Sequence, residues 1–274
     1  MNEFKVEGHE PSLMPPGEWD LVWSDEFDGT ELDRSKWDYR LSMMGKFHPA
    51  WVDRGVHLDG KSNAVFELMM EDGRPVSAQL QTGYNFMDQP LEKTIFGADH
   101  LQWTIGKLHE SLFLHKYGYY ECRCRLHQNT DAWWSAFWIQ SPVIGSSLDP
   151  GEAGVEIDVM ECFQPGRIHH HNVICGGYGL DCRVNKVGGF DGLDQTAFHR
   201  FGVLWEPTGY TFYVDGVEDG HIDKDVSHRP EFIMISTEVK GYRLEDHAPV
   251  PAAFEAVGKD NFIVDYIRVF DPKA

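Results

Sequence analysis

The 274-residue sequence predicts an all-β fold, a sandwich of antiparallel sheets. Many short stretches alternate apolar and polar residues, turns rich in glycine and aspartate separate them, and few segments have a helical period. The length fits one large all-β domain or two small ones. A content of 13% aromatic and 42% hydrophobic residues can supply a sizeable core.

The sequence predicts where the folded domain begins and where it ends. Residues 1–16 are polar and contain prolines, so we expect a flexible lead-in. The domain itself starts near Trp19, since Leu21 and Trp23 alternate with polar neighbours there. It closes with an apolar strand over residues 262–270, and no internal repeat or low-complexity segment interrupts it.

Between these ends, alternating segments predict strands. They cover residues 64–69, 76–82, 117–126, 131–138, 155–161, 198–205, 210–216 and 232–239. Residues 39–61 carry few strand signals, so we expect a long loop with one short strand there. Residues 176–192 are rich in glycine and predict a mobile loop. Residues 141–154, rich in Pro, Gly and Ser, form a loop that leads into the next strand.

Three carboxylates crowd residues 155–161, Val-Glu-Ile-Asp-Val-Met-Glu. β-Branched residues favour an extended backbone, in which successive side chains alternate between the two faces. Glu156 and Asp158 therefore share a face, but strict alternation turns Glu161 away from it. One extra residue, a β-bulge, would bring Glu161 back beside the other two, and bulges are enriched near active sites.

With that bulge the two glutamates form a candidate reactive pair. Side chains that lean toward each other across four effective steps of the strand leave about 5 Å between carboxyl groups. This separation suits a nucleophile and a proton donor on opposite sides of the scissile bond in a carbohydrate polymer. Solvated charges on an exposed strand are the alternative, but three on one face repel one another. A helix explains the spacing no better, because positions i and i+5 do not share a face.

The segment at residues 131–138 places aromatic rings on both faces of one strand. Alternation puts Trp133 and Phe137 toward the core, and Trp134 and Trp138 on the opposite face. Indole rings offer a broad apolar face to sugar C–H groups and a polar N–H at the edge. We therefore expect Trp134 and Trp138 to bind substrate.

These segments resemble a known family. Glu-Ile-Asp-Val-Met-Glu at residues 156–161 resembles the E-[IL]-D-x-x-E signature of glycoside hydrolase family 16, in the bulged variant of its laminarinases, agarases, porphyranases and carrageenases. Asp-Glu-Phe-Asp-Gly at residues 25–29 and Trp-Ser-Ala-Phe-Trp at residues 134–138 resemble it too, although Ser135 stands where the family has proline. The likeness runs from about residue 19 to residue 271, which leaves no room for a second domain.

The resemblance implies a concanavalin A-like jelly roll, with two curved antiparallel sheets and an open cleft, in a single catalytic domain over residues 17–274. It also implies that Glu156 is the nucleophile, Glu161 the general acid/base, and Asp158 the residue that tunes them. Since three adjacent carboxylates cannot all ionise freely, one pKa of the coupled set should rise.

Three adjacent histidines, residues 169–171, follow the carboxylates. Members of the family often place a histidine of this next strand near the sugar, and we assign His171 to that role, with a surface position as the alternative. Together with Cys162, Cys175 and Cys182 the histidines suggest zinc. The paired spacings C-x₂₋₄-C or H-x₃₋₅-H are not clearly present, so we assign no metal site.

The implied function is a retaining, endo-acting β-glycosidase that hydrolyses a polysaccharide by double displacement. The substrate stays open between a β-galactan of the agar, porphyran or carrageenan type and a β-1,3-glucan. Residues 39–61 lack the Asn- and Glu-bearing segment common in laminarinases, which argues against glucan. The net charge of −20 argues against a heavily sulfated galactan.

Other classes fit less well. A lectin-like binding module would not need three clustered carboxylates, and the family's transglycosylases usually have a spacing one residue shorter. No cofactor is required. A structural calcium ion on the convex sheet stays open, although carboxylates on a flat strand do not surround an ion.

Composition limits the partners and the compartment. The balance of 24 basic and 44 acidic residues disfavours nucleic acid, and no apolar run reaches membrane-spanning length. We expect a monomer. No signal peptide is visible, so the protein is either cytoplasmic or secreted with the sequence starting at its mature end. Five cysteines cannot form a full disulfide framework, and we expect Cys122 and Cys124 in the core.

Overall fold

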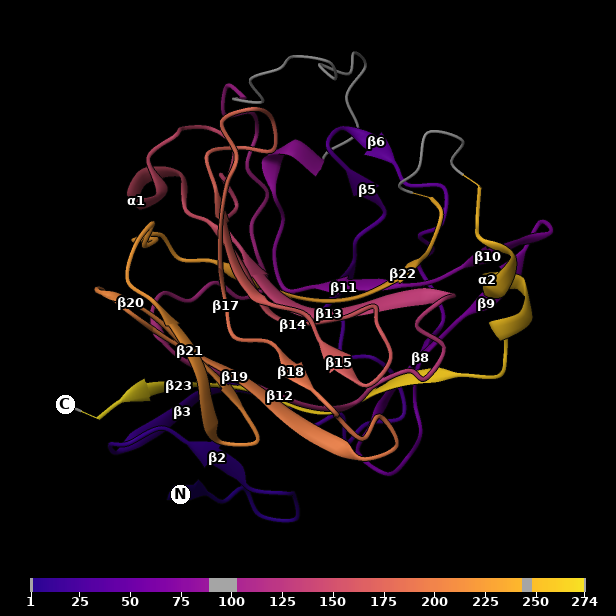
Figure 1. Cartoon of the computed structure of the whole chain (residues 1–274), viewed down its shortest axis with the longest axis horizontal. Helices are drawn as coiled ribbons and strands as arrows, with labels where there is room; N and C mark the ends of the chain where they lie inside the picture. The colour runs from indigo at the N-terminus through magenta and orange to yellow at the C-terminus, as the bar shows by residue number, and fades with distance from the viewer. Residues whose placement is uncertain (1, 89–102, 243–247, 274) are drawn as a thin grey trace.

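A computed structural model describes residues 2–88, 103–242 and 248–273 of the chain. Within these residues two antiparallel sheets lie face to face (Figure 1). The first, a seven-stranded sheet, has the order β17 (Arg183–Val187), β16 (His171–Cys175), β14 (Glu156–Cys162), β13 (Trp133–Gln140), β22 (Phe232–Val239), β11 (Gln79–Gln81) and β4 (Asp38–Tyr39).

The second sheet has eight strands, seven of them in its main path. Their order is β21 (Val217–Ile222), β20 (Gly209–Val214), β19 (Phe198–Glu206), β12 (Gly118–Arg125), β23 (Asn261–Pro272), β8 (Ala64–Glu67) and β7 (Val56–Leu58), with β3 (Trp19–Asp25) also paired to β23. The all-β sandwich expected from alternation is therefore confirmed.

Short ladders and helices complete the described chain. The ladders pair β1 (Asn2–Phe4) with β2 (Ser12–Met14), β5 (Ser42–Met43) with β6 (Lys46–Phe47), β9 (Met69–Glu71) with β10 (Arg74–Val76), and β15 (Arg167–Ile168) with β18 (Phe190–Asp191). The helices are the 3₁₀ turn η1 (Phe86–Asp88), α1 (Pro150–Ala153) and α2 (Pro251–Ala256). None of these described helices has the length and apolar character needed to cross a bilayer.

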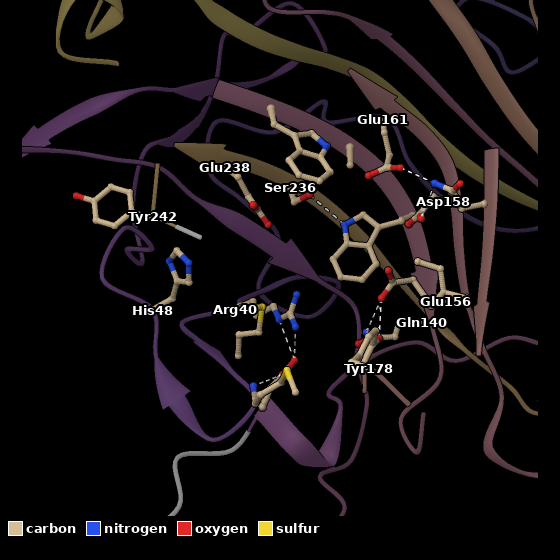
Figure 2. A pocket seen from close by; sticks show the side chains of 18 of the residues that line it. Arg40, His48, Gln140, Glu156, Asp158, Glu161, Tyr178, Ser236, Glu238 and Tyr242 are labelled. Carbon is tan, nitrogen blue, oxygen red and sulfur yellow. Dashed lines mark hydrogen bonds and ion pairs between the residues drawn. The ribbon is translucent and has the colours of Figure 1, made fainter. Parts of the chain in front are cut away.

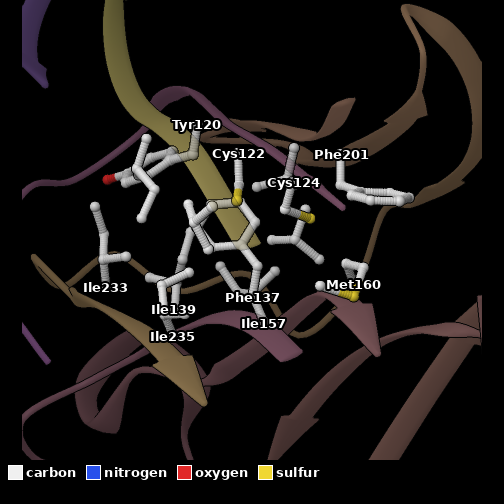
Figure 3. Packing of buried hydrophobic residues seen from close by; sticks show 14 of the residues in the cluster. Tyr120, Cys122, Cys124, Phe137, Ile139, Ile157, Met160, Phe201, Ile233 and Ile235 are labelled. Atoms are coloured by element: carbon white, nitrogen blue, oxygen red, sulfur yellow. The ribbon is translucent and has the colours of Figure 1, made fainter. Parts of the chain in front are cut away.

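The main core fills the space between the two sheets (Figure 3). Phe137 from β13 meets residues of β12 there, including Cys122 and Cys124, and all three side chains are fully buried. Trp133 is also buried, in a neighbouring cluster beside α2. The core positions predicted for these four residues are confirmed, and all five cysteines are free thiols.

The start of the chain differs from the expected flexible lead-in over residues 1–16. Residues 2–14 form the β1–β2 hairpin, which is held against the eight-stranded sheet. The Leu13 amide donates to Glu121 at 3.1 Å, and the Arg268 guanidinium donates to the Ser12 hydroxyl at 3.0 Å. The polar residues of this segment bind buried charged groups that lie far away in sequence, which local composition does not reveal.

Two further segments hold more structure than expected. The glycine-rich residues 176–192 contain β17, which pairs with β16 along its whole length and forms the edge of the seven-stranded sheet. Residues 39–61 contain the β5–β6 hairpin in addition to the one short strand expected there, β7. Backbone pairing with a neighbouring strand compensates for the weak strand propensity of these segments.

The connection into β14 is tightly built. Gly154 has φ +72°, and a Cβ atom there would lie 2.3 Å from the Ser141 Cβ. The next amide, of Val155, donates to the Glu231 carboxyl at 2.9 Å. Glu231 is fully buried, and this burial, with a smaller effect from the charge of Glu156, raises the pKa of Glu231 to about 8.

Replacing Glu231 with glutamine should change how stability depends on pH. Between its ordinary pKa near 4.5 and about 8, Glu231 holds a proton in the folded state that the unfolded chain releases, so stability falls as pH rises through this window. A neutral glutamine keeps the acceptor for Val155 and removes that dependence. Urea titrations at pH 5 and pH 8 give the free energy of unfolding at each pH. We expect the Glu231 contribution to its decrease between pH 5 and pH 8, roughly 3 kcal/mol, to be lost in Glu231→Gln. Glu255→Gln, at an exposed residue, is the control, and its stability should depend on pH as that of the wild type does. Equal pH dependence in the two variants would contradict the raised pKa assigned to Glu231.

Candidate active site

A groove of about 810 Å³ lies over the seven-stranded sheet (Figure 2). Its floor and one wall come from β13, β14, β16, β17 and β22, and residues 43, 44 and 46–49 around the β5–β6 hairpin line it as well. The hairpin therefore forms one rim of the groove, and the long sheet strands supply most of its polar side chains.

The predicted bulge is present in β14. Trp138 of β13 faces Asp158, whereas the adjacent Phe137 faces Met160, so Val159 is the extra residue between them. An extra residue shifts the alternation of the side chains by one position. The side chains that follow the bulge therefore point to the face opposite to the one expected from strict alternation.

As a result, Glu156, Asp158 and Glu161 all line the groove (Figure 2). Asp158 is 5% and Glu161 9% exposed, so these carboxyl groups lie close to the floor. Ile157 and Met160 point the other way and are fully buried in the main core. Packing on one face thus fixes the position of the carboxylates on the other.

One oxygen of Glu156 is held by two donors. The Tyr178 hydroxyl donates to Oε2 at 2.7 Å, and the Gln140 side-chain amide donates to the same Oε2 at 3.1 Å. Gln140 also donates to the Tyr178 oxygen at 2.7 Å, which fixes the direction of the phenol (Figure 2). Burial and then the charge of Glu156 raise the pKa of Tyr178 well above its ordinary value, so the phenol remains a donor.

Asn172 links the other two carboxylates. Its side-chain nitrogen donates to Asp158 Oδ2 at 3.2 Å and to Glu161 Oε2 at 2.7 Å. Asn172 is opposite Asp158 in the β14–β16 pairing and is 5% exposed. The amide thus fixes the relative orientation of the two carboxyl groups and engages one oxygen of Glu161.

Trp138 lines the groove as predicted, but the residue is only 8% exposed. Its indole nitrogen donates to the Ser236 hydroxyl at 3.0 Å, and the guanidinium of Arg40 lies 5.3 Å from the ring centre. Arg40 is paired with Asp88 at 2.7 Å. Trp138 is therefore a fixed part of the floor, with a positive charge beside it.

Trp134 also lines the groove as predicted, near the end of β14 that carries Glu161, and its ring is half-buried. The ring centre of Phe163 lies 4.7 Å from that of Trp134, and His169 follows at 4.5 Å from Phe163. Phe163 and His169 line the groove too, although neither was among the residues predicted to bind substrate.

The prediction that His171 lines the cleft is wrong. His171 is 1% exposed on the opposite face of the sheet, where its ring stacks on Phe212 with 4.6 Å between ring centres. Its Nδ1 bonds the carbonyl oxygen of Val159, the bulged residue, at 2.7 Å, and its Nε2 faces Asp219 at 3.1 Å. A carbonyl only accepts, so Nδ1 carries the proton and His171 supports the bulge from behind.

The three histidines do not converge on one point. His169 lines the groove, His170 bonds the Gly188 carbonyl oxygen, and His171 lies behind the sheet. Among residues 2–88, 103–242 and 248–273, no group of three or more His, Cys, Asp or Glu side chains is arranged to hold a metal ion.

Sequence reasoning missed Tyr178, Gln140 and Asn172. Asn172 could have been found, because the alternation His171-Val173-Cys175 is largely apolar and assigns Asn172 to the opposite, groove face. Tyr178 follows two glycines in a segment with no periodic pattern, so the sequence offers no signal for its position.

The site combines two glutamates with separate sets of donors. A phenol and an amide bind Glu156 through Oε2, which fixes the direction in which this carboxyl group faces the groove. A different amide, that of Asn172, binds Glu161 through Oε2. A nucleophile and a proton donor on one wall of an open groove suit the cleavage of a glycosidic bond.

Comparison with known proteins agrees with this chemistry. Residues 55–240 match the model of the glycosyl hydrolases family 16. The glucan endo-1,3-beta-glucosidase A1 of Niallia circulans is 30% identical over 207 residues, which cover 72% of this chain and 28% of that protein. The beta-porphyranase C of Zobellia galactanivorans is 25% identical over 316 residues, which cover 98% of this chain and 84% of that protein. The chain thus spans less than a third of the first relative and most of the second.

A solved structure shows the same fold. The laminarinase of Rhodothermus marinus superposes with a TM-score of 0.66 at 22% identity, covering 95% of this chain and all of that one (100%). The jelly roll expected from the sequence is therefore confirmed.

Proposed function

Because the chain belongs to family 16 of the glycosyl hydrolases, we propose that it is a retaining, endo-acting β-glycosidase that cleaves a β-galactan or a β-1,3-glucan by double displacement. One observation carries the proposal: the bulge in β14 puts Glu156, Asp158 and Glu161 on one wall of an open groove. A pure binding module has no need for three adjacent carboxylates that neighbouring side chains hold in place by hydrogen bonds.

In the first step Glu156 is the nucleophile. The oxygen not held by Tyr178 and Gln140 attacks the anomeric carbon, and the bond from this carbon to the leaving oxygen breaks. Glu161 gives its proton to that oxygen, so the shortened chain leaves as a neutral alcohol. The Asn172 amide donates to Glu161 Oε2 and holds this carboxyl group in position for the proton transfer.

In the second step Glu161, now ionised, takes a proton from water as the water oxygen attacks the anomeric carbon. The bond to Glu156 breaks, and its carboxylate regains its charge. Tyr178 and Gln140 donate to Oε2 at this moment and stabilise the departing carboxylate. Two inversions give net retention, and Asp158 keeps negative charge beside both glutamates. We assign no cofactor to either step.

The substrate is a β-galactan or a β-1,3-glucan, the classes named for two relatives, a beta-porphyranase and a glucan endo-1,3-beta-glucosidase. The test is the release of reducing ends from laminarin, lichenan, agarose, porphyran, κ-carrageenan and mucin-type galactans. We expect release from one of these polymers. Binding to a polymer without release from any of them would favour a lectin-like module.

Replacing Tyr178 with phenylalanine should weaken the reaction and shift its pH profile. A carboxylate that loses a hydrogen-bond donor holds its proton more tightly, so Glu156 ionises at a higher pH. We expect kcat/KM to fall about tenfold, with the low-pH limb of the profile displaced to higher pH. Steady-state kinetics from pH 4 to pH 9 measure both effects.

Tyr84→Phe is the matched control. It also removes a phenol that donates to a carboxylate, Asp38 at 2.9 Å, but neither residue lines the groove. Its profile should match the wild type. A Tyr178→Phe profile that also coincides with the wild type would show that the phenol does not act on Glu156.

A further inference from the structure

The half of β14 that carries Glu161 is held by histidines in place of regular strand pairing. The pairing of β14 with β16 covers the first three residues of β14 and stops at the bulge. Beyond it, the His171 ring bonds the Val159 carbonyl oxygen at 2.7 Å, and the His169 amide donates to the Glu161 carbonyl oxygen at 2.9 Å. Since Val159 is fully buried, its carbonyl oxygen needs such a partner.

The His171 ring is in turn held by the eight-stranded sheet. Its Nε2 faces the Asp219 carboxylate at 3.1 Å, and its plane stacks on Phe212, with 4.6 Å between ring centres and an inclination of 8°. Both partners come from the β20–β21 hairpin, so one element fixes the plane and the rotation of the ring. A carbonyl and a carboxylate only accept hydrogen bonds, so each ring nitrogen presents a hydrogen to its partner.

A second bulge places the carboxylate that meets this ring. Tyr213 of β20 faces Glu218 of β21. The residue before Tyr213, Phe212, faces Gly220, so Asp219 is the extra residue of β21. A bulge re-aims a side chain, and this one turns the carboxylate toward the seven-stranded sheet.

Asp219 is also fixed by the chain that follows β17. The Gly189 amide donates to its Oδ2 at 2.7 Å. Gly188 lies so close that a Cβ atom there would be 2.6 Å from the same oxygen. The bond from His171 lowers the pKa of Asp219, burial has a smaller and opposite effect, and the bond from Gly189 lowers it further, so the group is a carboxylate.

These contacts link the eight-stranded sheet to the reacting carboxyl groups. Val159 follows Asp158 directly and precedes Glu161 by two residues, so the direction of its backbone determines how both side chains point. On the groove face Asn172, the residue after His171, donates to both carboxyl groups. Two adjacent residues of β16 therefore hold the bulge from its two faces.

We propose that Asp219 and His171 are positioning residues of the reaction: Asp219 orients the His171 ring, and the ring holds the bulge where Glu161 points at the leaving oxygen. Neither Asp219 nor His171 lines the groove, so both act through the backbone of β14 and without contact with the substrate. This inference rests on the proposed function and deepens it, because it adds residues of the opposite sheet to the machinery.

Asp219→Ala tests the link with two substrates. The Asp219 side chain is 21% exposed, so its removal leaves the hydrophobic core intact. We expect kcat on the cleaved polymer to fall about tenfold, with KM close to that of the wild type. Release of dinitrophenol from a dinitrophenyl oligoglycoside needs no proton from Glu161, and it should fall by about twofold at most.

Asp219→Asn is the conservative variant. Its amide oxygen can accept from the Gly189 amide while its amide nitrogen donates to Nε2 of His171. The ring then keeps its orientation and its bond to Val159. Most of the lost kcat should therefore return in this variant.

Gly188→Ala displaces the same carboxylate without removing it, because the added Cβ would collide with Asp219 Oδ2. We expect the same preferential loss of kcat on the polymer. Gly192→Ala is the matched control, since Gly192 also has a positive φ, +81° against +62° at Gly188, but a Cβ there meets no atom within 4 Å. This control should keep the wild-type kcat.

Asp215→Ala is the control for Asp219→Ala. Asp215 also accepts from a histidine, His199 at 2.7 Å, at the turn of the same hairpin, and its loss should leave both rates unchanged. Wild-type kcat in Asp219→Ala would overturn the inference alone, and so would equal losses on the two substrates. A wild type that cleaves none of the polymers would instead refute the proposed function and this inference with it.

Discussion

Replacing Glu156 with glutamine is expected to lower kcat on the cleaved polysaccharide by roughly 10⁴-fold or more, the scale of loss when a nucleophile is removed. Glutamine has nearly the same shape, so the groove and its Tyr178 and Gln140 contacts should largely persist. The polymer should still bind with a KM or Kd close to that of the wild type. Reducing-end assays together with binding titrations separate these two effects.

Glu152→Gln is the control for this variant. Glu152 is an exposed residue of α1, four positions before Glu156, and it does not line the groove. It should keep wild-type activity. Release of reducing ends by Glu156→Gln at more than a few per cent of the wild-type rate would contradict the assignment of the nucleophile.

Replacing Glu161 with glutamine should produce a loss that depends on the leaving group. General acid catalysis contributes between about 10²- and 10⁴-fold, and we expect a loss in this range on the polymer, whose departing oxygen needs a proton. A dinitrophenolate leaves without protonation, so formation of the glycosyl-enzyme from a dinitrophenyl oligoglycoside should be little affected. A rapid burst of dinitrophenol followed by slow turnover is the expected time course.

Added azide sharpens the test of Glu161. Azide attacks the anomeric carbon without needing a base, so it should accelerate the slow phase and yield the β-glycosyl azide with net retention. An equal loss on both substrates, with no response to azide, would exclude Glu161 as acid/base. Because Asn172 binds Glu161, Asn172→Ala should also lose more activity on the polymer than on the dinitrophenyl oligoglycoside. We expect this difference to be smaller than in Glu161→Gln.

The regular part of the site could be predicted from the sequence because it depends on local alternation. Ile157 and Met160 face the core, and their burial forces Glu156, Asp158 and Glu161 to the groove once the bulge at Val159 is included. The sequence predicts the bulge because the three carboxylates can act together only if their side chains point to the same face of the strand.

His171 illustrates where the family likeness misleads. The chain between β15 and β16 is not paired as a continuous strand, so the face of His169 does not determine the face of His171. Within β16 the pattern His171-Val173-Cys175 packs on the core, and the buried imidazole finds partners in Val159 and Asp219. The family likeness places a histidine near the sugar, but the structure brings His169 to the groove instead.

Contacts between segments that lie far apart in the sequence could not be predicted from local patterns. Tyr178 reaches Glu156 from a glycine-rich segment, and its ring packs against the small cluster around Phe86 and Met87. Likewise the β1–β2 hairpin depends on Glu121 and Arg268, more than 100 residues away in sequence. Such positions follow from how the sheets assemble, which composition and periodicity do not encode.

The most direct test of the central claim is to trap the covalent intermediate. A dinitrophenyl 2-deoxy-2-fluoro-glycoside of the sugar that the polymer panel identifies should react with the wild type and slow the second step. Mass spectrometry of the digested protein should then find the fluoro-sugar ester on Glu156. An ester on Asp158 or Glu161, or inversion at the anomeric carbon with no adduct, would contradict the double-displacement mechanism proposed for these residues.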